Sequence, residues 1–103
     1  MNVATLAIAG LVLCAPLVAN AGDASALATK YACLACHAVD KKVVGPSYKE
    51  IASKYAGDAE ALGKLEQKVK NGSTGVWGQV PMPPNNVPDA DRKALVAWIL
   101  ATK

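Results

Sequence analysis

The sequence predicts an all-α protein of about four short helices. Four segments repeat their apolar residues at spacings typical of one helical face, and no segment shows the alternation of a β-strand. The chain of 103 residues is also too short for more than one domain. With two Trp, three Tyr and no Phe, so small a domain gains little net stability from side-chain packing alone, and a covalent or bound staple is expected.

Residues 1–21 are expected to be a secretory signal that is removed from the mature protein. They contain no Asp, Glu, Lys, Arg or His, and the stretch from Leu6 to Val18 is mostly apolar. The segment ends in Ala19-Asn20-Ala21, the small-x-small pattern of a cleavage site. The apolar stretch is shorter than the about 20 residues that span a membrane. We therefore expect cleavage before Gly22 and one exported domain over residues 22–103.

Two alternatives for this N-terminal segment stay open. One is a retained N-terminal anchor. The other is a lipoprotein signal, which Cys14 suggests, although Leu13 stands where such signals carry a small residue. We favour the cleaved signal, in which Cys14 is an ordinary apolar residue.

The four helical segments are separated by Gly, Pro and Asp residues that favour helix ends. Asp23 is a plausible N-cap for the first, and Gly72 stands where a C-cap glycine closes the third. The expected helices run from about Asp23 into Tyr31, from after Pro46 to Gly57, from about Asp58 to Asn71, and from about Pro88-Asp89 to the C-terminus. The expected inward residues are Ala24, Leu27, Ala28 and Tyr31; Tyr48, Ile51, Ala52 and Tyr55; Leu62, Leu65 and Val69; and Leu95, Trp98 and Ile99.

An irregular segment, residues 72–87, separates the last two helices. It contains three glycines and three prolines, a composition that excludes helix and central strand. Sixteen residues of irregular chain in so small a domain are typical of a functional loop. We therefore expect this loop to contribute to the functional site.

Cys33-Leu34-Ala35-Cys36-His37 is the sequence pattern of c-type haem attachment. On a helical turn, residues i, i+3 and i+4 share one face, so Cys33, Cys36 and His37 point the same way. The two thiols can then add to the two haem vinyl groups while the imidazole reaches the iron. Covalent haem would also supply the staple that so small a core needs.

The motif has three alternative interpretations. A Cys33–Cys36 disulfide is compatible with an oxidising compartment. A thioredoxin-like dithiol needs a βαβ context that the sequence lacks. A zinc site needs four ligands, and Cys33, Cys36 and His37 supply three, with no second cluster in the sequence. Haem attachment is the interpretation that best fits a short, exported, all-helical chain.

Met82 is the favoured second axial ligand. His37 is the only histidine, which excludes bis-histidine ligation, and Met82 is the only methionine after residue 21. A lone Met is more often core filler. Here, however, Pro81 and Pro83 flank it, and a residue before proline is held extended. A thioether opposite His37 would complete six-coordination and raise the reduction potential.

With these residues the chain resembles the small bacterial class I cytochromes c, most closely the cytochrome c551/c552 type. The resemblance covers the whole mature chain. It rests on the haem motif together with four further segments: Val44-Gly45-Pro46-Ser47-Tyr48, Lys70-Asn71-Gly72, Gly75-Val76-Trp77-Gly78 and Pro81-Met82-Pro83-Pro84-Asn85. It implies the class I cytochrome c fold, in which about four helices wrap round one covalently bound haem c.

The resemblance also implies roles for residues around the ligands. The Pro46 carbonyl would accept a hydrogen bond from His37 Nδ1, which fixes the ring. Asn85 would donate to the Met82 sulfur. Trp77 and Lys68 would contact a buried haem propionate; for Lys68 a solvated surface lysine is nearly as plausible. Trp98, by contrast, is expected to be a core residue where the last helix crosses the first.

Two protein ligands on the iron favour an electron carrier over an enzyme. They leave no vacant position, whereas a peroxidase or a gas-binding protein needs one. The sequence also has no second histidine for acid–base catalysis. The alternative is a haem-based enzyme or sensor, with peroxidase-like or gas-binding activity, which would require that Met82 is not a ligand.

The resemblance implies a periplasmic, monomeric carrier of a respiratory chain. Its donor would be of the cytochrome bc1 type, and its acceptor a nitrite reductase or a cytochrome oxidase. The net charge of +3 with scattered lysines argues against nucleic acid and suits acidic partners. Small apolar residues, Ala35, Val76 and Val80, are expected at the docking rim, with Lys30, Lys41, Lys42 and Lys49 outside them.

Overall fold

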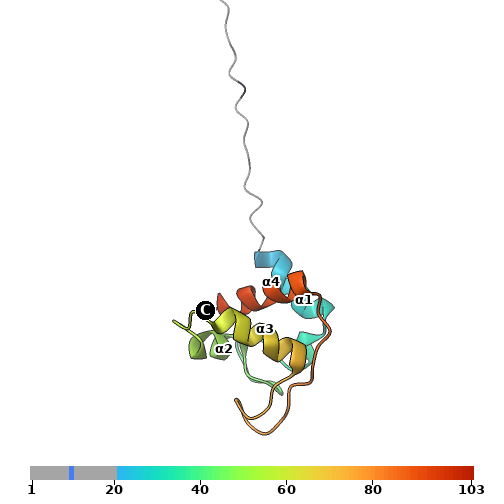
Figure 1. Ribbon diagram of the computed structural model, residues 1–103, viewed down its shortest axis with the longest axis vertical. Coiled ribbons are helices and arrows are strands. Elements are labelled where there is room, and N and C mark those ends of the chain that lie inside the picture. The colour runs from blue at the N-terminus through green and yellow to red at the C-terminus, as the bar shows by residue number, and fades with distance from the viewer. Residues whose placement is uncertain (1–9, 11–20) are drawn as a thin grey trace, which may run out of the picture.

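A computed structural model describes residue 10 and residues 21–103 (Figure 1). The expected signal segment, with Cys14, therefore lies almost wholly outside the described residues. The described elements are α1 (Ala21–Lys30), the 3-10 helix η1 (Cys33–Ala35), α2 (Tyr48–Lys54), α3 (Ala61–Asn71) and α4 (Asp89–Leu100). The all-α expectation is confirmed, since these residues form helices and two isolated β-bridges but no strand. None of the described helices is long and apolar enough to cross a membrane.

The C-terminal helix α4 lies at the centre of the fold and packs against α1, α2 and α3 (Figure 1). Its residues Leu95 and Val96 are almost completely buried. Trp98 is partly buried against the same core, as expected, and its ring meets the edge of Tyr48 from α2 at 5.4 Å between centroids. The irregular segment between α3 and α4 lies beneath the helices in Figure 1 and forms one wall of the candidate site.

Two helix ends are closed by local hydrogen bonds that the sequence encodes. At the start of α2, the Ser47 hydroxyl accepts a hydrogen bond from the Glu50 backbone N–H at 3.1 Å, which satisfies one of the free donors of the first turn. At the end of α3, Gly72 takes φ +82° and its N–H donates to the Lys68 carbonyl at 2.9 Å. The expected C-cap glycine is therefore confirmed.

Three predicted helix boundaries were wrong by a few residues. Helix α1 begins at Ala21, so Asp23 lies inside its first turn and is not the N-cap. Helix α2 ends at Lys54, three residues before Gly57. Helix α3 begins at Ala61 because Asp58 instead forms a turn of its own. Its Oδ1 accepts a hydrogen bond from the Glu60 N–H at 2.8 Å, and its Oδ2 pairs with Lys64 Nζ at 2.9 Å.

A long-range hydrogen bond ties the segment before η1 to the central helix. The Tyr31 hydroxyl donates to Asp91 Oδ2 at 2.6 Å, across 60 residues of sequence. The hydrogen bond to Asp91, followed by burial and the negative charge of Asp91, raises the pKa of the Tyr31 hydroxyl above its usual value. The bond fixes the exit of α1 two residues ahead of Cys33.

Replacement of Tyr31 by Phe is expected to lower the unfolding temperature at neutral pH. Because the pKa of Tyr31 is higher in the folded state, its stabilising contribution is fully present below the unfolded pKa of about 10 and is lost as pH rises through the folded value. The stability difference between wild type and Tyr31→Phe should therefore narrow at alkaline pH. Urea unfolding at about pH 7 and about pH 11 measures this difference in the free energy of unfolding. An equal difference at both pH values would contradict the stabilising role of the Tyr31 hydroxyl.

Candidate functional site

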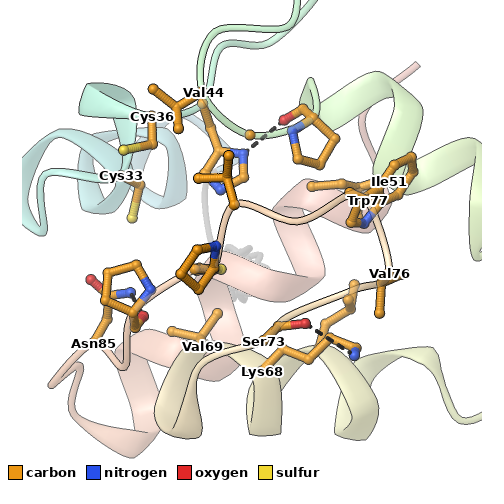
Figure 2. Close-up of a pocket in the computed structure, with 18 of the residues that line it drawn as sticks. Cys33, Cys36, Val44, Ile51, Lys68, Val69, Ser73, Val76, Trp77 and Asn85 are labelled. Atoms are coloured by element: carbon orange, nitrogen blue, oxygen red, sulfur yellow. Dashed lines mark hydrogen bonds between the residues drawn. The ribbon is translucent and has the colours of Figure 1, made fainter.

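A cavity of about 350 Å³ opens between η1, α3 and the loop that follows α3. Figure 2 shows Cys33 of η1 and Cys36, the residue that follows η1, on one side, Lys68 and Val69 from α3 below, and Trp77 in the loop at the far end. Its volume lies within the range of small-molecule and cofactor sites. All eight residues predicted from the sequence line it: Cys33, Cys36, His37, Pro46, Lys68, Trp77, Met82 and Asn85.

The two cysteines and the histidine lie on one short helical turn, as their spacing predicts. Ala32 takes a left-handed conformation, φ +58°, which ends the approach from α1 and starts η1. The His37 N–H then donates to the Cys33 carbonyl at 3.0 Å, which closes the turn. Both cysteines are free thiols, so the structure contains no Cys33–Cys36 disulfide. Burial raises the pKa of the Cys33 thiol.

The imidazole of His37 has a fixed orientation and a fixed tautomer. Its Nδ1 lies 2.7 Å from the carbonyl oxygen of Pro46, the contact that the sequence resemblance implies. A carbonyl oxygen only accepts hydrogen bonds, so Nδ1 carries the proton. Nε2 is then left with a free lone pair, which is what a metal-ligating histidine needs.

Met82 is held by its own backbone in the loop that faces the histidine. Its N–H donates to the Ser73 carbonyl at 2.8 Å, and the Ser73 N–H donates to the Met82 carbonyl at 3.0 Å. The side chain is partly buried and packs against the core. The loop is therefore anchored to the end of α3 at the residue whose thioether lines the cavity.

The residues expected to contact a propionate lie at the same cavity, and Asn85, the expected donor to the Met82 sulfur, has another partner in the structure. Lys68 Nζ donates to the Ser73 hydroxyl at 3.4 Å, and Trp77 remains 40% exposed, beneath the Lys54 ammonium at 5.2 Å from its ring centroid. Asn85 does not donate to the Met82 sulfur. Its Nδ2 donates instead to the Pro83 carbonyl at 2.9 Å, because an Asn side chain readily bonds to backbone two residues away.

Several cavity-lining residues were not predicted as functional. Tyr48, which was assigned to the core alone, stacks on the His37 ring with centroids 5.5 Å apart. Lys54, which lies outside the cavity lining, covers the Trp77 ring, and no sequence pattern indicates this pairing. The predicted apolar rim is present at Val76 and Val80. Val44 also lines the cavity and is exposed, and three further large apolar side chains, Leu34, Val39 and Val43, are exposed outside the cavity lining.

The four groups that converge on the cavity do not form an ordinary metal-ion site. Within residues 21–103 no group of three or more His, Cys, Asp and Glu side chains is placed to hold a metal ion. The zinc alternative therefore finds no support there. Two thiols, an imidazole with a free Nε2 and a thioether are instead the donor set that fits a covalently bound haem.

The cytochrome c family model matches residues 21–103. This chain belongs to the cytochrome c family. Cytochrome c-551 of Pseudomonas aeruginosa is 51% identical over 81% of this chain and 80% of its own length. Cytochrome c-552 of Nitrosomonas europaea is 58% identical over 84% of this chain and 86% of its own length. The crystal structure of wild-type Nitrosomonas europaea cytochrome c552 superposes with a TM-score of 0.75 at 59% identity, covering 77% of this chain and 99% of that one.

The family membership confirms the fold and the broad function. This cytochrome has the all-α, four-helix cytochrome c fold and is of the c551/c552 type. It is an electron-transport protein with covalently bound haem c, and it is not an enzyme.

Proposed function

We propose that Cys33 and Cys36 hold the haem of this cytochrome through two thioether bonds, and that His37 and Met82 are the axial ligands of its iron. Each attachment adds a thiol S–H across a vinyl C=C: one C–S bond forms and the proton goes to the neighbouring carbon, so no oxidant is consumed. Bound there, the haem supplies a one-electron ferric/ferrous couple. The observation that carries the proposal is the convergence of both thiols, the imidazole and the thioether on one cavity.

Each side chain then has a distinct task. The Pro46 carbonyl holds His37 Nδ1–H, which makes the ligand more basic and keeps Nε2 aimed at the iron. Met82, held at its backbone by Ser73, offers a soft sulfur that favours the reduced iron. Lys68 and Trp77, which line the same cavity, would donate to a propionate. Asn85 helps to hold the loop that carries Met82, because its side chain donates a hydrogen bond to the Pro83 carbonyl.

The proposed cellular role is that of an exported electron carrier whose haem would be exposed at one edge. We propose that residues 1–21 are a cleaved signal and that residues 22–103 act as a monomer in the periplasm. The protein would accept electrons from a cytochrome bc1-type donor and deliver them to a nitrite reductase or a cytochrome oxidase. The apolar rim around Val76 and Val80, with lysines outside it, supports small and short-lived redox contacts.

One absorption spectrum of the mature protein, ferric and then ferrous, tests the ligand assignment. The protein must come from a host with c-type maturation machinery. We expect a low-spin c-type spectrum, the weak near-infrared-edge band of a methionine–ferric bond, and haem that stays with the protein in acidified acetone. A high-spin ferric form would remove Met82 as ligand and favour the haem-based enzyme or sensor. Haem lost to the solvent would remove the thioether bonds.

Electron exchange with an anionic reagent is expected to depend on salt and on the rim lysines. Lys42 lines the cavity mouth and is exposed. The oxidation rate of the ferrous protein by hexacyanoferrate(III) should fall as ionic strength rises, because salt screens the attraction. Replacement of Lys42 by Gln should lower the low-salt rate by up to about tenfold, because one unit charge about 8 Å from this trianion in water contributes about 1.6 kcal/mol before salt screening.

The matched control for that variant is Lys103→Gln, which removes the same charge at the C-terminus, outside the cavity lining. A rate that does not change with salt, or equal losses in the two variants, would contradict steering by the rim.

A further inference from the structure

Tyr48 is held against His37, the proposed axial ligand, by burial, by a backbone hydrogen bond and by ring stacking. It is 1% exposed, and its backbone N–H donates to the Ala38 carbonyl at 2.9 Å, directly after His37. Its ring stacks on the His37 ring at 5.5 Å with 22° between the planes, and the Trp98 ring meets it at 75°. The ring cannot turn away from this place without breaking packing on both sides.

The hydroxyl of this fixed ring has no hydrogen-bond partner. Within residues 21–103, Tyr48 Oη and Arg92 Nε are the buried side-chain N and O atoms without a partner. Arg92 is otherwise satisfied, since its terminal nitrogens bond to the Val87 carbonyl and to Asp89. Tyr48 has a single polar atom, and a hydroxyl buried without a partner is costly. Because Tyr48 lines the cavity, the missing partner is expected there.

The sulfur of Cys33 is an acceptor that the chain can offer this hydroxyl. Cys33 and Tyr48 both line the cavity, and Cys33 packs against the core cluster that contains Tyr48. Burial first, and then the proximity of the Cys33 sulfur, raise the pKa of the Tyr48 hydroxyl, so it is a neutral donor at physiological pH. As a free thiol, Cys33 points its own weak donor toward the Tyr31 carbonyl, 4.0 Å away. Once it is a thioether it has no proton and can only accept.

We propose that the Tyr48 hydroxyl donates a hydrogen bond to the Cys33 sulfur when that sulfur carries the haem. The inference rests on the proposed attachment at Cys33. It makes Tyr48 a positioning residue that joins two attachment points, through its ring to His37 and through its hydroxyl to Cys33. A donor at this sulfur also withdraws electron density from the edge of the haem, which favours the ferrous form and raises the reduction potential.

Tyr48→Phe in the mature holoprotein tests this assignment, because it removes the hydroxyl and keeps the ring. We expect a low-spin spectrum like that of wild type, a lower midpoint potential, and an unfolding equilibrium constant about 2- to 10-fold larger, the effect of one lost hydrogen bond. Tyr55→Phe is the control. Tyr55 packs against the same core but does not line the cavity, so its potential should stay at the wild-type value.

A double-mutant cycle identifies the acceptor. In a Cys33→Ala background, where the haem keeps its bond to Cys36, Tyr48→Phe should no longer lower the potential or the stability, because the acceptor is gone. Equal effects in both backgrounds would overturn the assignment, since the hydroxyl would then bond to a propionate or a water. If the double variant does not accumulate, a potential of Tyr48→Phe equal to that of Tyr55→Phe overturns it.

These outcomes differ from a failure of the haem proposal itself. If Cys33 carries no thioether, wild type already shows this in the haem it releases to acidified acetone. If Cys33 is attached but Tyr48→Phe raises stability at unchanged potential, the hydroxyl is unpaired in the holoprotein and only the Tyr48 inference falls.

Discussion

Gly45→Ala is expected to displace the ring of His37, the proposed iron ligand, because the added methyl group would overlap that ring. A Cβ at Gly45 would lie 2.6 Å from His37 Cε1 and 3.0 Å from Nδ1. Carbon atoms pack at about 3.5–4.0 Å, so the ring would have to move by about 1 Å. The backbone cannot yield instead, because the Gly45 N–H donates to the Cys36 carbonyl at 2.7 Å. Nor can the ring move freely, since Pro46 and Tyr48 hold it from other sides.

The expected cost is about 1–3 kcal/mol in the free energy of unfolding of the holoprotein, the usual range for an overpacked site. The reduction potential should change as well, because the displaced ring in the variant would strain the hydrogen bond between His37 and Pro46. Urea unfolding and a redox titration measure the two effects. Gly63→Ala is the control: Gly63 lies in α3 with nothing within 4 Å, so alanine there should stabilise by up to about 1 kcal/mol. Effects of the same sign in both variants would contradict the close approach.

Gly72→Ala is expected to displace Met82, the proposed second ligand of the haem iron. Gly72 has φ +82° and ψ +172°, a conformation that is essentially restricted to glycine. A Cβ there would also lie 2.7 Å from the Met82 carbonyl oxygen and 3.1 Å from Pro84 N and Cδ. Because Met82 and Ser73 exchange two backbone hydrogen bonds, pushing on the Met82 carbonyl shifts the whole ligand segment.

Backbone strain and overpacking each cost about 1–3 kcal/mol, so a total loss of about 2–6 kcal/mol is expected for Gly72→Ala. The methionine–ferric absorption band should weaken or disappear. Gly75→Ala is the comparison, because Gly75 also has a positive φ, +88°, but nothing lies within 4 Å of its added Cβ. It should lose stability through strain alone and keep the band. A full band in Gly72→Ala would show that the glycine does not position Met82.

The sequence predicted which key side chains share one cavity, because their placement depends on short-range patterns. The spacing of Cys33, Cys36 and His37 places them on one turn whatever the rest of the fold does. The prolines around Met82 restrict the loop locally. Helix type was predicted for the same reason, since apolar spacing reports which face is buried.

Predictions failed where a side chain had two local options of similar energy. Asp58 was assigned to the start of α3, yet it accepts from Glu60 and pairs with Lys64 outside the helix. Asn85 was assigned to the Met82 sulfur, yet it donates to the nearer Pro83 carbonyl. Residue type fixes that such groups seek a hydrogen bond, but the surrounding backbone decides which one they make.

The sequence by itself determined that this chain is an all-α cytochrome c, that eight named residues share one cavity, and that Gly72 closes α3. Only the tertiary structure decided what touches those residues from far along the chain. The stacking of Tyr48 on His37, the bond from Tyr31 to Asp91 and the contact of Gly45 with the ligand ring each depend on how separate segments pack. Spacing along a helix determines which face is buried, but the partner on that face depends on packing between elements, which local spacing does not encode.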